Sequence, residues 1–141
     1  MQNAHFTKQY MIRFSHCDPA GIVYFPQYLV LSNWLVEDWL TEGLGIDFAT
    51  FIGDKRLGLP IVKLECEFFK PSRQGELLTF DLRLIRLGCS SVTIEITGSV
   101  REELRLRSNQ VLVHTLLDTG AAIEITGELR AALSDLSVEA I

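Results

Sequence analysis

Apolar and polar residues alternate along several segments of the chain, and a period of two is typical of half-buried β-strands. Four segments show this alternation, and a fifth, longer one toward the C-terminal end is less cleanly patterned. The strands predicted in this way are 6–14, 62–68, 78–84, 92–96 and 104–117. Turn residues at 71–75, 87–90 and 102–103 separate the last four strands, which favours antiparallel neighbours.

A different pattern occupies Pro26–Glu42, where apolar residues cover most of the circumference of a helix about 25 Å long. Pro26 suits the first helical position, and Gly43 and Gly45 suit its end. A helix that is apolar nearly all round is predicted to be buried. A final short helix is predicted to run from a capping Thr126 to about Leu136.

One long apolar helix after the first strand, followed by four antiparallel strands, predicts an α+β fold whose sheet wraps the helix. The 141 residues are enough for a single domain, 1–141, and no linker or repeat divides them. One helix covers only one face of the sheet and leaves its edges open. We therefore expect a homo-oligomer, at least a dimer, with a homotetramer preferred.

Composition narrows the class of partner. The net charge of −5 disfavours nucleic acid, and no apolar run approaches the ~20 residues of a membrane span. The first residues show no charged segment leading into an apolar one, so no secretory signal is expected. Three cysteines without CxxC spacing favour a reducing cytoplasm over a disulfide framework.

Common cofactor motifs are absent from the sequence, including GxxxxGK[ST], GxGxxG after a strand, GxSxG and HExxH. The three histidines, His5, His16 and His114, are not spaced with cysteines as a zinc site requires, so no metal is expected. Catalysis must then come from a carboxylate, a cysteine, a histidine or backbone dipoles.

The segment from His16 to Tyr28 carries the most chemistry. It places Asp18 in a Gly- and Pro-bearing loop directly before the long helix. Free N–H groups at a helix N-terminus can hold an oxyanion, and the same field keeps a nearby carboxylate ionised as a base or nucleophile. An aspartate before a helix is also a common turn or cap residue. A Cys17–histidine pair is the competing nucleophile, although the adjacent His16 would point to the opposite side.

The sequence Cys-Asp-Pro-Ala-Gly-Ile-Val-Tyr-Phe-Pro-Gln-Tyr at 17–28 resembles the hot-dog thioesterases, in particular the 4-hydroxybenzoyl-CoA thioesterase branch and its acyl-CoA thioesterase relatives. The resemblance continues in order through 58–62, 69–76 and 122–125. It implies the hot-dog fold, a five-stranded antiparallel sheet wrapped around one long central helix. It also implies a thioester hydrolase that consumes acyl-CoA as a substrate and needs no cofactor.

By position, the resemblance makes Asp18 the catalytic carboxylate, acting as nucleophile or as general base on water. The backbone N–H groups around Tyr24 and Phe25 become the donors that polarise the thioester carbonyl. A thiolate leaves readily, so a site with one carboxylate is sufficient. The resemblance also implies an aromatic acyl group, as in 4-hydroxybenzoyl-CoA.

Residues expected to contact the substrate are His16, Tyr28, Pro60, Lys70 and Arg73. Because the protein is acidic, a polyanionic CoA needs a local basic rim, and Lys70 with Arg73 is the preferred pair. Two alternatives stay open: a thioesterase for aliphatic acyl-CoA or acyl-carrier-protein substrates, and a hot-dog oligomer that binds acyl-CoA without catalysis.

Overall fold

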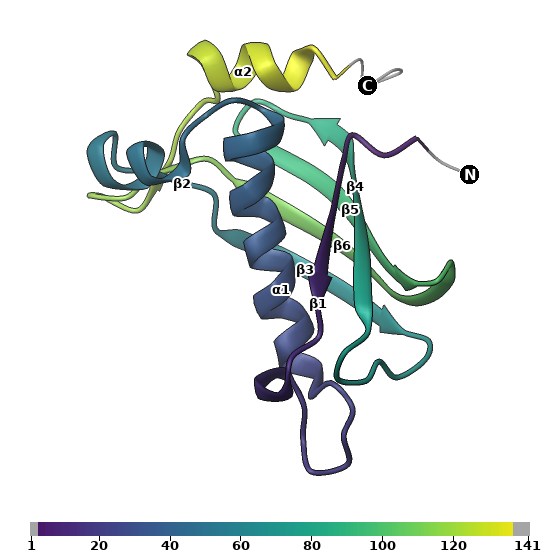
Figure 1. Ribbon diagram of the computed structural model, residues 1–141. Coiled ribbons are helices and arrows are strands. Elements are labelled where there is room, and N and C mark those ends of the chain that lie inside the picture. The colour runs from purple at the N-terminus through teal and green to yellow at the C-terminus, as the bar shows by residue number, and fades with distance from the viewer. Residues whose placement is uncertain (1–2, 137–141) are drawn as a thin grey trace.

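The computed structural model describes residues 3–136, in which a five-stranded antiparallel sheet curves around one helix (Figure 1). Its strands are β1 (Phe6–Met11), β3 (Ile61–Phe68), β4 (Leu77–Leu87), β5 (Ser91–Val100) and β6 (Glu103–Val113). They lie in the order β1-β4-β5-β6-β3, so β1 and β3 form the two edges. Helix α1 (Phe25–Asp38) crosses the concave face. The predicted α+β architecture is confirmed.

Smaller elements gather at one end of the sheet. Strands β2 (Leu57–Gly58), β7 (Thr115–Leu116) and β8 (Ala121–Ala122) form a second sheet in the order β2-β7-β8. Helix α2 (Gly127–Ser134) lies at this same end, away from the loop that precedes α1 (Figure 1). The remaining helical pieces are a 3₁₀ turn at Phe14–His16 and π-helical turns at Trp39–Gly43 and Thr50–Asp54.

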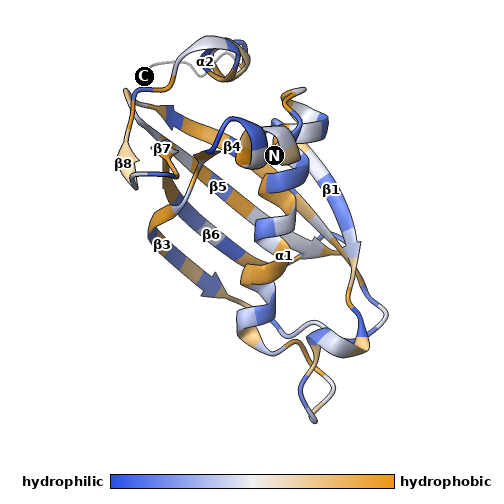
Figure 2. Ribbon diagram, turned by 90° about the vertical axis from the view of Figure 1, so that its left-hand side faces the viewer, coloured by the Kyte–Doolittle hydropathy of each residue, from blue (hydrophilic) through white to orange (hydrophobic). Residues whose placement is uncertain are grey.

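Alternation along the strands separates the two faces of the large sheet, as the stripes in Figure 2 show. The inner residues Leu78, Phe80, Leu82, Ile94 and Ile96 are fully buried against α1 residues such as Leu31 and Leu35. The outer face is polar and carries cross-strand hydrogen bonds such as Thr7 Oγ1 to Asp81 Oδ1 at 2.7 Å. Because only one face of the sheet is buried, apolar and polar residues alternate along these strands, and the sequence could therefore predict them.

Four element ends differ from their predictions. The first strand stops at Met11, because His16 Nδ1 accepts the Arg13 N–H and turns the chain, leaving Phe14 79% exposed. The segment predicted as 104–117 breaks at His114 into β6 and β7. The long helix leaves α-geometry at Trp39 and ends as a π-turn at Gly43. Thr126 precedes α2 but its side chain makes no capping hydrogen bond.

The prediction of a helix buried all round is wrong for the single chain. Trp34 on α1 is 40% exposed on the side of β1, where it meets the Tyr10 ring edge-on at 5.9 Å. At the other edge of the sheet, strand β3 is exposed along nearly its whole length, with Val62 at 62%. The exposure of β3 has a topological cause, since it is an edge strand that pairs only with β6 in the described chain. No helix in the described part of the chain is long and apolar enough to cross a membrane.

Candidate active site

Asp18 lies in a tight turn closed by the antiparallel bridge between Cys17 and Val23. Its N–H donates to the Ile22 carbonyl at 3.0 Å, and its carbonyl accepts the Gly21 N–H at 2.9 Å. Gly21 has φ +81°, a conformation that glycine adopts without strain. The side chain is half-buried, and its Oδ1 accepts the Ala20 N–H at 2.9 Å. The Pro-Ala-Gly sequence therefore builds a turn that holds one carboxylate in place.

This turn is fixed to the connection between β3 and β4 and to the start of α1. The Val23 N–H donates to the Ser72 carbonyl at 2.9 Å, and Ile22 forms a backbone bridge with Arg73. The Tyr24 N–H donates to the His16 carbonyl at 3.0 Å. The Phe25 N–H, the first of α1, has no hydrogen-bond partner in the described chain. Of the two predicted amide donors, Phe25 is thus the one left unoccupied.

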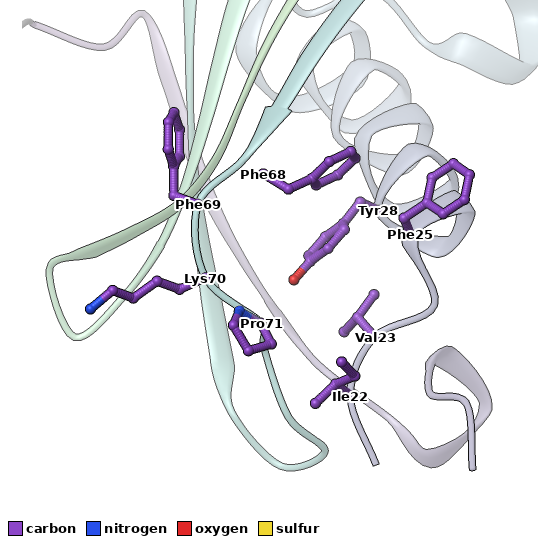
Figure 3. A pocket seen from close by; sticks show the side chains of 8 residues that line it. All are labelled: Ile22, Val23, Phe25, Tyr28, Phe68, Phe69, Lys70 and Pro71. Carbon is purple, nitrogen blue, oxygen red and sulfur yellow. The ribbon is translucent and has the colours of Figure 1, made fainter. Parts of the chain in front are cut away.

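A cavity of about 500 Å³ opens between this helix N-terminus and the end of β3 (Figure 3). The Tyr28 and Phe68 rings stack with centroids 5.6 Å apart, and Phe25 meets Phe68 edge-on at 6.1 Å. Such distances are those of favourable aromatic pairs. The residues lining the cavity are Ile22, Val23, Phe25, Tyr28, Phe68, Phe69, Lys70 and Pro71.

Two polar groups face this apolar space. The Tyr28 hydroxyl is buried beside Ser72 without a well-formed hydrogen bond in the described chain, and its burial raises the pKa of Tyr28. Lys70 lines the cavity and forms an exposed ion pair with Glu103 at 3.1 Å. The cavity thus offers a buried hydroxyl inside and a cation at its rim.

Arg105 supports the cavity from behind. It is buried, and its Nη1 donates to the Pro71 carbonyl, Ser72 Oγ and Glu76 Oε1 at 2.8, 3.1 and 2.8 Å. The Arg105 guanidinium holds the pKa of Glu76 below its usual range. These partners lie 29 to 34 positions away, so one sequence carries no local signal for them.

The predicted site residues fall into three groups. The first group lines the cavity and consists of Phe25, Tyr28 and Lys70. The second group belongs to the turn that forms the cavity wall: it contains Asp18 and Tyr24, together with Arg73, whose backbone bridges to this turn. The third group, His16 and Pro60, does not line the cavity. The buried His16 ring meets Trp34 edge-on at 5.8 Å, and burial lowers the pKa of His16. Pro60 precedes β3, at the opposite end of that strand from the cavity.

The structure does not bring a cysteine and a histidine together as a nucleophile and base. Cys17 Sγ donates to the Arg13 carbonyl. The His16 ring makes one hydrogen bond in the described chain, in which its Nδ1 accepts the Arg13 N–H. His114 lies at the other end of β6 and stacks on Phe51. Residues 3–136 also contain no group of three or more potential metal ligands.

Comparison with known proteins gives a consistent group of relatives. The family described as the thioesterase-like superfamily matches residues 12–133. A 1,4-dihydroxy-2-naphthoyl-CoA hydrolase of Rippkaea orientalis is 36% identical over 89 residues, which are 63% of this chain and 62% of that protein. A second, from Acaryochloris marina, is 38% identical over 71 residues, 50% of this chain and 51% of that protein. The chain thus matches roughly half to three fifths of these relatives' lengths.

Solved structures share the fold. A 1,4-dihydroxy-2-naphthoyl-CoA thioesterase from Synechocystis superposes with a TM-score of 0.83 at 24% identity, covering 94% of this chain and 97% of the other. A gentisyl-coenzyme A thioesterase gives 0.81 at 24% identity, covering 90% and 98%. At these identities the likeness confirms the hot-dog fold implied by the residues at 17–28.

Proposed function

The chain belongs to the thioesterase-like superfamily, and on that premise we propose that it hydrolyses the thioester of an aromatic acyl-CoA to the free acid and CoA. The observation that carries this proposal is the aromatic cavity at the N-terminus of α1, directly beside the Asp18 turn. Relatives named as hydrolases of a naphthoyl-CoA thioester support it.

An aromatic acyl group suits the cavity in size and chemistry. A volume of about 500 Å³ lies within the usual range for small-molecule sites. Phe25, Tyr28 and Phe68 offer flat apolar faces for a planar ring. The buried Tyr28 hydroxyl provides one hydrogen bond for a polar substituent on that ring. A plain alkyl chain would leave this hydroxyl unpaired, which favours substituted aromatic substrates.

In the proposed reaction the thioester carbonyl oxygen accepts the Phe25 N–H, which has no other partner in the described chain. The positive end of the α1 dipole stabilises the negative charge that develops on this oxygen. Asp18 takes a proton from the attacking water, or its carboxylate attacks the carbonyl carbon directly. The C–S bond then breaks, and the thiolate of CoA leaves.

A single turnover in ¹⁸O-labelled water identifies a nucleophilic Asp18 when the label is found on the protein, because general-base catalysis cannot place it there. A general base gives a product acid that carries one labelled oxygen from the water. A nucleophile instead gives an acyl–aspartyl anhydride, and water attack at the Asp18 carbonyl then leaves the label on the protein in the first turnover. Both routes use the same carboxylate, so either result retains Asp18 as the catalytic residue.

Binding of CoA phosphates is assigned to the basic residues at the cavity rim. Lys70 lines the cavity, and the exposed Arg73 lies beside it in the same connection without an ion-pair partner among residues 3–136. Phosphate contacts from such residues give affinity through charge and hydrogen bonding.

The test is hydrolysis of a panel of acyl-CoAs, followed by the released thiol. We expect kcat/KM for 4-hydroxybenzoyl-CoA and 1,4-dihydroxy-2-naphthoyl-CoA to exceed that for hexanoyl-CoA by about tenfold or more, which corresponds to about 1.4 kcal/mol. Preference for hexanoyl-CoA or an acyl-carrier-protein thioester would overturn the aromatic assignment. Tight binding of every acyl-CoA without released thiol would show a binding protein.

A further inference from the structure

A second cavity, of about 250 Å³, lies beneath α2 at the other end of the sheet. The first cavity adjoins Phe68, which pairs with Leu106 near the start of β6, whereas His114 follows the end of that strand. Eight residues of extended chain separate these points by about 25 Å. The wall of the second cavity is apolar and is formed mainly by Ile46, Phe51, Leu57, Ile123 and Leu129. The two cavities are therefore separate sites.

His114 is the buried polar side chain among the residues that line this cavity, and it is only 4% exposed. Its Nδ1 lies 3.1 Å from the Glu124 carbonyl oxygen, which can only accept, so Nδ1 carries the hydrogen. Its Nε2 is buried and has no hydrogen-bond partner among residues 3–136. Stacking on Phe51 at 6.1 Å holds the ring in this orientation. A buried polar atom without a partner is rare and indicates a missing occupant.

The start of α2 contributes donors to the same cavity. Thr126, Gly127 and Glu128 line it, and the Thr126 side chain leaves the first amides of the helix uncapped. Lys55 and Glu128 pair at 3.1 Å, so the two charged residues in the wall neutralise each other. Uncapped helix amides attract a negatively charged acceptor. Together with Nε2, they match the two oxygens of one carboxyl group.

We propose that this second cavity binds a small monocarboxylic acid with an apolar body about the size of one substituted ring. The acid's proton lies between a carboxyl oxygen and His114 Nε2, and the other oxygen accepts from the α2 amides. A cavity of about 150 Å³ lined by similar side chains accommodates benzene, so one of 250 Å³ accommodates benzoic acid. This assignment is independent of the function proposed for the first cavity.

The first test is titration of the ¹⁵N-labelled chain of 141 residues with benzoate, observed by amide chemical shifts. Saturable shifts are expected at 126–129 and around His114, with benzyl alcohol binding more weakly because it lacks the second oxygen. Three results would overturn the proposal: no saturable shift, shifts confined to the first cavity, or equal affinity for benzyl alcohol. The first of these would leave water as the partner of Nε2.

Variants locate the interaction. In His114→Asn the amide NH₂ still reaches the Glu124 carbonyl but Nε2 is lost, so benzoate affinity should fall about tenfold or more. Ile123→Phe should block binding by filling the cavity without altering His114. Tyr28→Phe, in the first cavity, is the matched control and should leave the shifts at 126–129 unchanged. Unaltered benzoate affinity in both second-cavity variants would contradict the proposal, and if His114→Asn fails to fold, Ile123→Phe and the wild-type shift map decide it.

Discussion

The two carboxylate oxygens of Asp18 have different surroundings. Oδ1 accepts the Ala20 N–H and so fixes the side chain in its turn. Oδ2 has no hydrogen-bond partner among residues 3–136. A carboxylate oriented through one oxygen and unoccupied at the other is prepared for proton transfer or nucleophilic attack without reorganising the loop.

Replacing Asp18 by Asn separates these two functions. The Asn side-chain oxygen can still accept the Ala20 N–H, so we expect the melting temperature and KM to stay close to those of the wild type. Since an amide is neither a base nor a nucleophile at neutral pH, kcat should fall by a factor on the order of 10²–10⁴. Steady-state kinetics with the best acyl-CoA measure this. Turnover within a few-fold of the wild type would show that Asp18 is not the catalytic group.

Lys70 and Arg73 are expected to act on binding alone. Replacing both by Ala should raise KM more than it lowers kcat, because contacts to distant phosphates stabilise the ground and transition states alike. The salt dependence of KM should become flatter. The matched control replaces Arg56 and Arg86, exposed residues away from this cavity, and should change neither quantity. Equal KM values in the two double variants would assign phosphate binding to other residues.

Glu76 links the wall of the first cavity to acid stability. Its pKa is lowered from 4.5, mainly by the hydrogen bond from Arg105. Below pH 4.5 the unfolded chain therefore binds more protons than the folded one, so this stabilisation is complete above pH 4.5 and is lost as the pH falls through the lower, folded-state value. Glu76→Gln should lower the free energy of unfolding by about 2–3 kcal/mol at neutral pH. Urea unfolding at several pH values measures this: the difference in the free energy of unfolding between the wild type and Glu76→Gln should shrink in acid. A difference that stays constant with pH would show that the ion pair of Glu76 with Arg105 does not contribute to acid stability.

At the level of elements, the sequence predicted what short-range patterns control. Strands β4 and β5 alternate because one face is buried, and the turn at 17–23 depends on contiguous residues. Element ends were missed where a distant or backbone contact decides them, as when His16 accepts the Arg13 N–H after β1. The far wall of the cavity was missed for the same reason, because Phe68 reaches Tyr28, and Arg105 reaches Pro71, only through tertiary pairing.

Gly98 shows how tightly the middle of the sheet is packed. A Cβ added there would lie 2.5 Å from Leu106 Cδ2 and 3.1 Å from Phe80 Cε1, under the inner face of β5. Gly98→Ala should therefore destabilise the protein by about 1–3 kcal/mol, the usual cost of overpacking a core. Thr97→Ala, on the opposite face, is the control and should cost less. Denaturant unfolding measures both, and an unchanged midpoint for Gly98→Ala would show that Leu106 moves aside freely.

At the scale of the whole molecule, one side carries most of the exposed apolar surface. The unpaired edge of β3 presents Val62, Leu64 and Phe68, and the exposed Phe25 of α1 meets the Phe68 ring edge-on. An open apolar strand edge exposes both hydrogen-bonding groups and hydrophobic area, which soluble proteins normally cover. The first cavity opens at the same side, through Phe25 and Phe68. A second copy of the chain placed here would bury the edge and enclose the cavity together.

We therefore expect a homo-oligomer in which β3 lies in an interface. It is at least a dimer, and a homotetramer is the assembly that we predict. Sedimentation velocity at micromolar concentration should show no monomer for the wild type. Val62→Lys with Leu64→Lys places charges on the exposed strand and should give folded monomers, because burying unpaired ammonium groups costs more than the edge contacts supply. Thioester hydrolysis should fall in parallel, since the cavity then stays open to water.

The control, Ala121→Lys with Ala122→Lys on the exposed strand β8, should leave assembly unchanged. A wild-type monomer would refute the interface and the enclosed cavity together, whereas an oligomer that survives both β3 substitutions would place the interface on another face.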